Sequence, residues 1–320
     1  MTRAPWFWSH DGVAARLLAP LSAVGAALTA RRVARPGWQA PVPVICCGNV
    51  TVGGAGKTTL VLDLARRLVE RGRSVHVLLR GYGGSARGVH RVARDDPAAL
   101  VGDEALLLAA VAPTWIGGDR AASAREAVRA GADVLLMDDG LQNPTLRKSF
   151  SILVVDGATG FGNGRVLPAG PLREPVAAAA ARCRATVLIG ADATGALSRL
   201  DLPVLRADLV QDASIGRLAG QRVLAFAGIA IPEKFFAPLR QAGAVVAAAR
   251  AFPDHHPYSA RDLDALLQQA EALDARLVTT PKDAVRLPPA FRAGVTVVGV
   301  GLEWEDRAGI EALLDAALAG

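Results

Sequence analysis

Residues 42–59 have the sequence VPVICCGNVTVGGAGKTT and carry the strongest structural signal in the chain. The apolar run from Val42 to Cys47, which follows Pro41, predicts a short buried strand of a parallel sheet. A glycine-rich turn follows, and the amphipathic stretch from Leu60 to Arg71 predicts a helix after it. A strand, a glycine-rich turn and a helix in this order predict a phosphate-binding loop, the P-loop of nucleotide-binding proteins.

Each part of the predicted P-loop has a chemical task. Glycines allow successive backbone N–H groups to turn inward on the phosphates, and the helix N-terminus adds its positive end. We expect Lys57 to reach the β- and γ-phosphates of ATP, and the Thr58 hydroxyl to bind Mg²⁺. The strict pattern has glycine where Thr51 stands, which is a departure. The predicted nucleotide-binding residues are Thr51, Val52, Gly53, Gly54, Ala55, Gly56, Lys57 and Thr58.

A second buried strand is predicted from Ala132 to Met137, directly before Asp138-Asp139-Gly140. A carboxylate at the C-terminal end of a central parallel strand is where P-loop folds place a metal ligand. Two adjacent aspartates point to different sides of the chain, so we expect only one of them to face Mg²⁺ or its waters. The alternative is a plain Asp-Asp-Gly turn, which the preceding strand makes the weaker interpretation.

The composition indicates a folded protein of one large or two medium domains. Of 320 residues, 51% are hydrophobic and 21% charged, which permits a sizeable core and excludes wholesale disorder. No run reaches the roughly 18 to 20 apolar residues of a membrane-spanning helix, so a polytopic membrane protein is excluded. The three cysteines have no metal-ligand spacing and indicate reduced core residues of a cytosolic protein.

The N-terminal segment is basic and partly apolar. Asp11 is the only acid in the first 62 residues, although the formal net charge of the whole chain is only +6. Residues 17–30 are uncharged, too short to cross a bilayer, and flanked by arginines, which predicts a helix lying in a membrane interface. An ordinary core helix remains the alternative, while a signal peptide and a nucleic-acid site are disfavoured. The apolar positions at helical spacing are Leu17, Leu21, Val24 and Leu28.

Strand-like runs alternate with helical stretches along the chain, which predicts an α/β fold with a parallel, doubly wound P-loop core. We expect three parts: an N-terminal helix region (1–36), the P-loop core (37–214) and a smaller α/β domain (215–320). A joining segment is expected around Leu202 to Asp212. The predicted strands are 42–47, 74–79, 132–137, 151–155, 185–189, 223–226, 245–248, 276–279 and 295–300. In the second half the predicted helices lie near 233–241, 259–273 and 306–319.

A P-loop alone does not separate kinases, GTPases and ATP-driven motors. The residues 279–283, TTPKD, do not fit a guanine-binding motif, and a partitioning ATPase would need a lysine near Val52. A small-molecule kinase needs a base for its acceptor hydroxyl. Asp103 is one candidate, although it could instead be the N-cap of the predicted helix 105–111. The other is the Asp254-His255-His256 segment, in which Asp254 could orient an imidazole; its alternative is a polar surface turn.

Eight ordered blocks carry a family resemblance over most of the chain. They are 48–58 (GNVTVGGAGKT), 80–83 (RGYG), 101–104 (VGDE), 138–142 (DDGLQ), 162–175 (GNGRVLPAGPLREP), 225–236 (AFAGIAIPEKFF), 252–258 (FPDHHPY) and 279–286 (TTPKDAVR). With these blocks the chain resembles the tetraacyldisaccharide 4′-kinases, the lipid A 4′-kinases of Gram-negative bacteria. The resemblance implies an enzyme that uses Mg·ATP to phosphorylate the 4′-hydroxyl of an acylated glucosamine disaccharide, giving lipid IVA.

The resemblance also implies roles for individual residues. Asp103 would be the base and would work together with His255. Lys57 would bind the phosphates. The implied metal shell is Thr58, Glu104, Asp139 and Gln142, and the residues expected near substrate or behind the site are Arg120, Asp138, Arg173, Glu174 and Asp254. Since members of the family look attached to the cytoplasmic face of the inner membrane, we expect that location here. We expect no nucleic-acid partner and infer no obligate protein partner.

The chain departs from the family pattern at three positions: Leu141 stands where phenylalanine is usual, Asn143 where histidine is usual, and Thr59 where proline is common. Asn143 has no titratable group, so we assign it no catalytic role. Two other functions compete with the kinase. A membrane-associated regulatory NTPase would hydrolyse ATP without making a phosphorylated lipid, and another P-loop kinase would act on a soluble acceptor.

Overall fold

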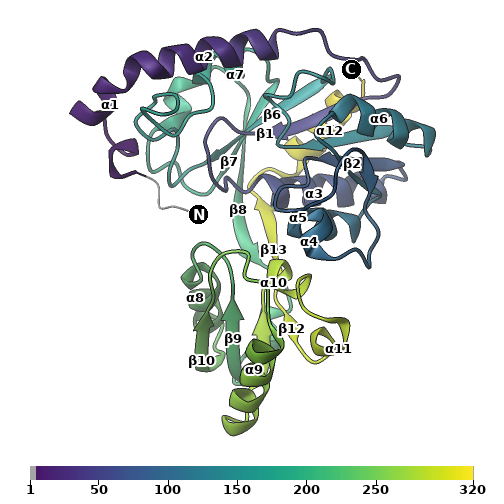
Figure 1. Cartoon of the computed structure of the whole chain (residues 1–320), viewed down its shortest axis with the longest axis vertical. Coiled ribbons are helices and arrows are strands. Elements are labelled where there is room, and N and C mark those ends of the chain that lie inside the picture. The colour runs from purple at the N-terminus through teal and green to yellow at the C-terminus, as the bar shows by residue number, and fades with distance from the viewer. Residues whose placement is uncertain (1–4, 320) are drawn as a thin grey trace.

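The structure, a computed structural model, describes residues 5–319. Within these residues the chain forms two sheets of different size, which lie one above the other in Figure 1. The larger sheet has the strand order β13-β8-β7-β6-β1-β5-β2-β4-β3, and the smaller has the order β10-β9-β11-β12. The predicted fold class, a parallel P-loop core with a second, smaller α/β domain, is confirmed.

Hydrophobic runs explain the centre of the large sheet. β1, β2 and β5 are buried at every position, as parallel strands are when helices cover both faces of a sheet. Only the edge strands β3 and β13 are antiparallel to their neighbours within the described chain. The strands are β1 (Val44–Gly48), β2 (Val75–Leu79), β3 (His90–Arg91), β4 (Thr114–Ile116), β5 (Val134–Asp138), β6 (Phe150–Asp156), β7 (Ala185–Ile189), β8 (Val204–Gln211) and β13 (Val300–Trp304).

Two hydrophobic clusters cover the two faces of the large sheet. On one face, α3 buries Leu60, Leu64 and Leu68 against the strands, and α12 adds Leu314. On the other face, α6 and α7 pack against Leu135 and Met137. Sequence spacing explains the burial, since i, i+4 and i+8 fall on one side of α3. The helices are α3 (Lys57–Glu70), α4 (Ala98–Val101), α5 (Asp103–Ala109), α6 (Arg120–Arg129), α7 (Val176–Ala180) and α12 (Arg307–Ala319).

The small domain is a four-stranded parallel sheet with a helix on each face. α8 buries Phe235, Phe236 and Leu239 on one side, and α9 buries Leu263 and Leu266 on the other. Its elements are β9 (Arg222–Ala227), α8 (Glu233–Gln241), β10 (Val245–Ala251), α9 (Ala260–Ala272), β11 (Arg276–Thr279), α10 (Pro281–Ala284), α11 (Pro289–Arg292) and β12 (Thr296–Val297). The short 3-10 helices are η1 (Trp6–Trp8), η2 (Ala196–Arg199) and η3 (Ile215–Leu218).

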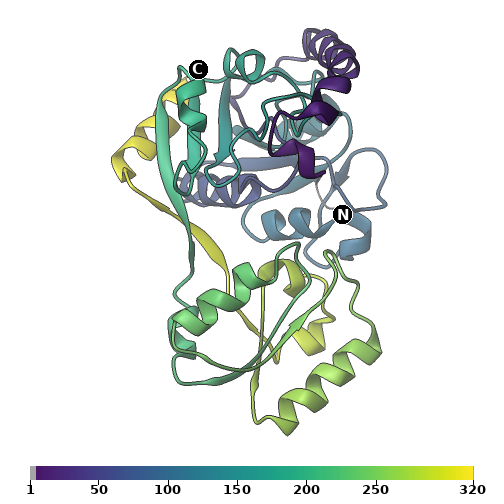
Figure 2. The same ribbon diagram turned by 90° about the vertical axis from the view of Figure 1, so that its left-hand side faces the viewer.

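The expected C-terminal boundary of the small domain differs from the observed one. The predicted strand 295–300 is two strands, of which β12 belongs to the small sheet and β13 to the large one. α12 also packs into the core of the large domain, so the small domain is inserted between β8 and β13. The expected joining segment 202–212 is the strand β8. Figure 2 shows β8 and β13 running side by side between the domains, where they form an antiparallel pair.

The N-terminal region forms α1 (Val13–Leu17) and α2 (Ala19–Val33), and α2 lies across the large domain (Figure 1). Small side chains face the protein: Ala15 and Ser22 are buried, and the Ser22 hydroxyl donates to Val166 O at 2.7 Å. Its large apolar side chains face outward, so the core-helix alternative is wrong. Among residues 5–319, no helix is long and apolar enough to cross a bilayer. The exposed side chains are Leu17, Leu21, Val24 and Leu28, each 59–76% exposed.

Candidate active site

The glycine-rich loop joins β1 to α3 and leaves open space around its backbone. Gly53 and Gly54 have no atom within 4 Å of a Cβ position, so a ligand can approach the chain there. Gly56 caps α3 with φ of 77°, and a Cβ at this position would lie 2.5 Å from Ile189 Cδ1. Only glycine meets both conditions without strain. The loop therefore has the open backbone and the helix N-terminus that bind phosphate.

Lys57 begins α3 and is buried, with 9% of its surface exposed. Its Nζ donates to Asn49 Oδ1 at 3.1 Å and lies 3.9 Å from Asp139 Oδ1. Asn49 was not among the predicted site residues. It comes directly after β1, which positions its side chain beside the loop. Asn49 thus holds the ammonium group of Lys57 beside the loop.

Asp138 is the carboxylate that meets the Thr58 hydroxyl. Thr58 Oγ1 donates to Asp138 Oδ2 at 3.1 Å, while Asp138 Oδ1 is buried without a hydrogen-bond partner. Burial, followed by the charges of Glu104 and Asp139, raises the pKa of Asp138 to about 7. A buried carboxylate with a free oxygen beside a threonine hydroxyl fits a hard divalent cation such as Mg²⁺. In residues 5–319 no three His, Cys, Asp or Glu side chains converge on a metal site; nucleotide-bound Mg²⁺ needs only one or two carboxylates.

Asp139 has a different environment from Asp138. Both of its carboxylate oxygens accept hydrogen bonds from Arg173 Nη1 at 2.8 Å. The residue has a φ of 53°, in the left-handed region that non-glycine residues rarely adopt. The family resemblance implies Asp139 in the metal shell and Asp138 near substrate or behind the site. Their contacts favour the opposite order, with Asp138 beside Thr58 and Asp139 between Arg173 and Lys57.

Asp103 and His255 meet across the two domains. His255 Nδ1 lies 2.9 Å from Asp103 Oδ2, and Asp254 Oδ1 lies 3.9 Å from the other ring nitrogen. The hydrogen bond to Asp103 raises the pKa of His255, and burial opposes this rise. The N-cap of α5 is Gly102, whose φ is 88°, so Asp103 is not the cap. An aspartate hydrogen-bonded to a histidine can accept a proton from a hydroxyl group.

The remaining predicted residues surround this centre. Glu104 pairs with Lys282 of the small domain at 3.1 Å. Gln142 donates to Asn49 O and to Glu174 Oε1. Arg120 is 3% exposed and its Nε has no partner, and burial lowers its pKa to about 10. Asn143 accepts hydrogen bonds from the backbone and hydroxyl of Thr145, which is a turn-forming role.

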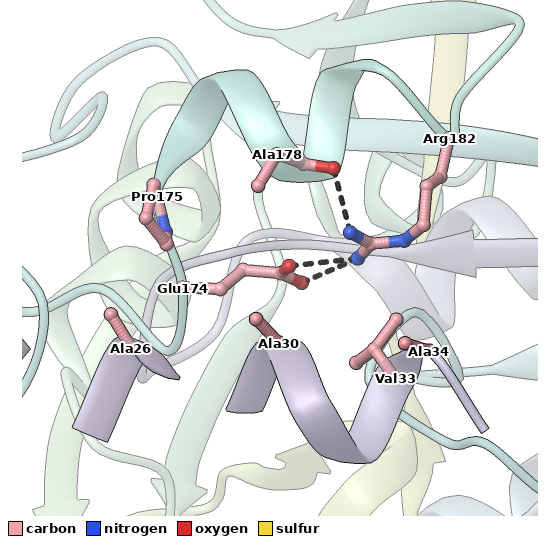
Figure 3. A pocket seen from close by; sticks show the side chains of 8 residues that line it. All are labelled: Ala26, Ala30, Val33, Ala34, Glu174, Pro175, Ala178 and Arg182. Carbon is pink, nitrogen blue, oxygen red and sulfur yellow. Dashed lines mark hydrogen bonds and ion pairs between the residues drawn. The ribbon is translucent and has the colours of Figure 1, made fainter. Parts of the chain in front are cut away.

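Glu174 is buried, and Arg182 binds both of its oxygens at 2.8 Å, as Figure 3 shows. This pair borders a cavity of about 270 Å³ between α2 and α7, away from the phosphate loop. The cavity is otherwise apolar, and Figure 3 shows Ala30 of α2 facing Glu174 across it. Arg182 was not predicted: it lies eight residues after Glu174, and the sequence alone does not show that the chain around α7 brings the two side chains together. The lining residues are Ala26, Ala30, Val33, Ala34, Glu174, Pro175, Ala178 and Arg182.

Arg286 is a third residue that the sequence did not single out, after Asn49 and Arg182. Its Nε lies 3.3 Å from Asp103 Oδ2, on the same oxygen that His255 contacts. It belongs to the block TTPKDAVR, so its place in the chain was noted without a role. The carboxylates and the loop of the large domain therefore face three basic side chains of the small domain, His255, Lys282 and Arg286.

Comparison with known proteins identifies relatives over the whole chain. The family model described as tetraacyldisaccharide-1-P 4′-kinase matches residues 14–319. The tetraacyldisaccharide 4′-kinase of Gluconacetobacter diazotrophicus is 59% identical, over 98% of this chain and 97% of the relative. That of Rhodospirillum centenum is 53% identical, over 99% and 97%. The fold matches the crystal structure of the "apo" form of LpxK from Aquifex aeolicus in complex with ATP, with a TM-score of 0.78 and 24% identity, over 95% of this chain and 99% of that one.

Proposed function

The chain belongs to the tetraacyldisaccharide-1-P 4′-kinase family, and on that premise we propose that it transfers the γ-phosphate of ATP to the 4′-hydroxyl of a tetraacylated glucosamine disaccharide 1-phosphate. The products are ADP and lipid IVA, so the protein is a phosphotransferase with an alcohol acceptor, in lipid A biosynthesis. The observation that carries the mechanism is the contact of Asp103 with His255 across the two domains.

The P-loop half of the site binds and orients ATP. The amide groups around Gly53 and Gly54 and the N-terminus of α3 bind the phosphates, and Lys57 adds a positive charge. Thr58 and Asp138 would hold Mg²⁺, with Glu104, Asp139 and Gln142 near it. When bound, Mg²⁺ neutralises charge on the phosphate oxygens. Phosphoryl transfer depends mainly on such positioning and neutralisation.

The interdomain half of the site removes the proton of the acceptor hydroxyl. Asp103 is buried and accepts a hydrogen bond from His255, which holds the carboxylate in place. As the 4′-oxygen attacks the γ-phosphorus, its proton passes to Asp103, and the bond from the γ-phosphorus to the bridging oxygen breaks. Arg120 and Arg173 are the cations of the large domain that could bind phosphate groups of ATP or substrate.

The reaction is tested with γ-³²P-ATP, Mg²⁺ and detergent-dispersed tetraacyl disaccharide 1-phosphate. We expect label on the lipid with the wild-type protein and none with Lys57→Ala. Label released only as inorganic phosphate would favour the regulatory NTPase, and label transferred only to soluble acceptors would favour another P-loop kinase. Asp138→Asn tests the magnesium site, and we expect a higher Mg²⁺ concentration for half-maximal rate.

We further propose that the N-terminal helices attach the enzyme to the cytoplasmic face of the inner membrane. The stripe Leu17, Leu21, Val24 and Leu28 is exposed, and arginines follow it at the end of α2. Such a helix binds an anionic bilayer through apolar burial and charge.

In flotation with anionic liposomes we expect the wild type to move with the lipid and Leu21→Glu/Val24→Glu to stay behind. The matched control, Leu209→Glu/Leu267→Glu, alters exposed apolar residues elsewhere and should still float. Wild-type protein that fails to float at low salt would contradict the proposal.

A further inference from the structure

We propose that Arg286 is a positioning residue that, together with His255, sets the orientation of the Asp103 carboxylate toward the acceptor hydroxyl. This inference rests on the proposed function, because it assigns Asp103 the role of base. It concerns a side chain of the small domain that contacts a residue of the large one.

The guanidinium of Arg286 is buried and held on several sides. The side chain is 5% exposed, and Nη2 donates to Asp283 Oδ1 at 2.9 Å. Asp283 is fully buried, and it also accepts hydrogen bonds from Gly228 N and the Tyr258 hydroxyl. A buried charge is costly unless partners surround it, and here the carboxylates of Asp283 and Asp103 balance it. Arg286 is therefore fixed before any substrate arrives.

Arg286 and His255 contact the same oxygen of Asp103. Arg286 Nε lies 3.3 Å from Oδ2, and His255 Nδ1 lies 2.9 Å from it. The Nε hydrogen itself is donated to Lys282 O at 3.0 Å, so the contact with Asp103 is an ion pair. Among the described residues, none donates a hydrogen bond to Asp103 Oδ1. With Oδ2 held by two groups of the small domain, Oδ1 is the oxygen left to accept the proton.

Arg286 also supports the loop that carries His255. Its Nη1 donates to His256 O at 2.9 Å, and its Nη2 donates to Gly228 O at 3.0 Å. Gly228 O is also the acceptor for His255 N. His255 has a φ of 58°, a conformation that a non-glycine residue adopts only when its surroundings hold it there. The planar guanidinium of Arg286, with its five donors, thus contacts Asp103 Oδ2 and also holds the loop that places His255 on the same oxygen. A lysine cannot do both in the same way.

A double-mutant cycle tests the inference with the kinase assay. We compare Arg286→Gln in the wild-type and in the Asp103→Asn background. In the wild type we expect kcat to fall by about 10²-fold, because a small misplacement of a reacting group can cost that much. The KM for ATP should change by less than about twofold. In the Asp103→Asn background we expect little further loss, since Arg286 then has no base to orient.

Two further variants separate positioning from folding. Arg286→Lys keeps a charge near Asp103 but cannot hold both loop carbonyls, so we expect an intermediate kcat and a near-normal melting temperature. If Arg286→Gln fails to fold, the same cycle is run with Arg286→Lys. The matched control is Arg222→Gln. Among the described residues the Arg222 side chain donates to Leu273 O alone, within the small domain, so this variant should retain wild-type kcat.

The outcomes are distinguishable. Wild-type kcat in Arg286→Gln, or an equal fold-loss in both backgrounds, would overturn the inference and leave the proposed function intact. Full activity in Asp103→Asn would instead remove the base on which both depend. A cycle in which the two substitutions are strongly non-additive would support the positioning role.

Discussion

The large and small domains are both parallel α/β layers, yet they supply different kinds of groups to the site. The large domain contributes a glycine loop, a helix N-terminus and the carboxylates Asp103, Glu104 and Asp138. The small domain contributes side chains alone, and those that reach across are His255, Lys282 and Arg286. The groups that bind ATP therefore come from the large domain alone, whereas activation of the acceptor hydroxyl needs groups from both domains.

Lys57→Ala tests the claim that the large domain alone handles the phosphates, and it has the largest expected effect. Lys57 is the buried cation of the loop, so we expect no measurable phosphoryl transfer to lipid. The control is Lys234→Ala, which removes an exposed lysine of the small domain and should leave the rate unchanged. A near-normal rate in Lys57→Ala would mean that the loop does not bind the transferred phosphate.

Asp103→Ala and His255→Ala test the interdomain half. We expect Asp103→Ala to lower kcat by about 10²- to 10⁴-fold, the usual contribution of a general base. ATP binding, measured by calorimetry with a non-hydrolysable analogue, should change little. His255→Ala leaves the carboxylate in place and should cost less. If both variants weaken ATP binding as much as they lower kcat, the division of labour between the domains is wrong.

Gly56→Ala sharpens the comparison by disturbing only the nucleotide half. A side chain at φ of 77° is strained, and its Cβ would collide with Ile189. We expect a loss of about 1–2 kcal/mol of unfolding free energy. All five tryptophans lie outside the four-stranded domain, so tryptophan fluorescence during urea unfolding reports this change. Gly54→Ala, which meets no neighbouring atom, should leave the unfolding free energy unchanged.

The pH dependence of stability should have opposite signs in the two domains. The pKa of Asp138 is raised to about 7 in the folded protein. The contribution of protonated Asp138 to the unfolding free energy is therefore fully present below pH about 4 and is lost as the pH rises through 7. The pKa of Asp262, in the capping box of α9, is lowered to about 2 by its Ser259 and His256 contacts. Its contribution is present above pH about 4 and is lost as the pH falls toward 2.

This difference is measured by unfolding in EDTA without nucleotide. As the pH rises from 5 to 8, we expect the unfolding free energy obtained from the tryptophan-detected transition to decrease more in the wild type than in Asp138→Asn. Asp139, Glu104 and Lys57 also face Asp138, so the comparison with the variant isolates its share. Asp262→Asn should lower the unfolding free energy weakly at every pH above about 4, and its curve should meet that of the wild type as the pH falls toward 2. An Asp138→Asn curve parallel to the wild type would contradict the first part.

Local patterns predicted the central elements well and the connections poorly. β1 and α3 follow from a hydrophobic run and a glycine turn, which act within a few residues. The run 295–300 was assigned to one strand because an apolar run does not tell which sheet it joins. Pairing of β13 with β8 depends on residues far apart in sequence.

The candidate site shows the same limit. Lys57 and Thr58 were recognisable because a phosphate loop fixes their spacing. The order of Asp138 and Asp139 depends on which carboxylate meets Thr58, and adjacent residues in a sequence do not reveal that. Arg286 was missed because its partner Asp103 lies in a distant segment of the chain. Arg182 was missed although Glu174 precedes it by only eight residues, because the sequence does not show that the chain around α7 brings the two together.

The insertion of the small domain between β8 and β13 affects how the chain is made. A ribosome releases β8 first, then the complete four-stranded unit, and only afterwards β13 and α12. Until then β8 is an open edge that could pair with a strand of another nascent chain, a known route to aggregation. The small domain can thus fold before β13, the last strand of the large sheet, has been synthesised. A chain that ends just after β12 would contain all four strands of the small sheet but would lack β13 and α12 of the large, nucleotide-binding domain.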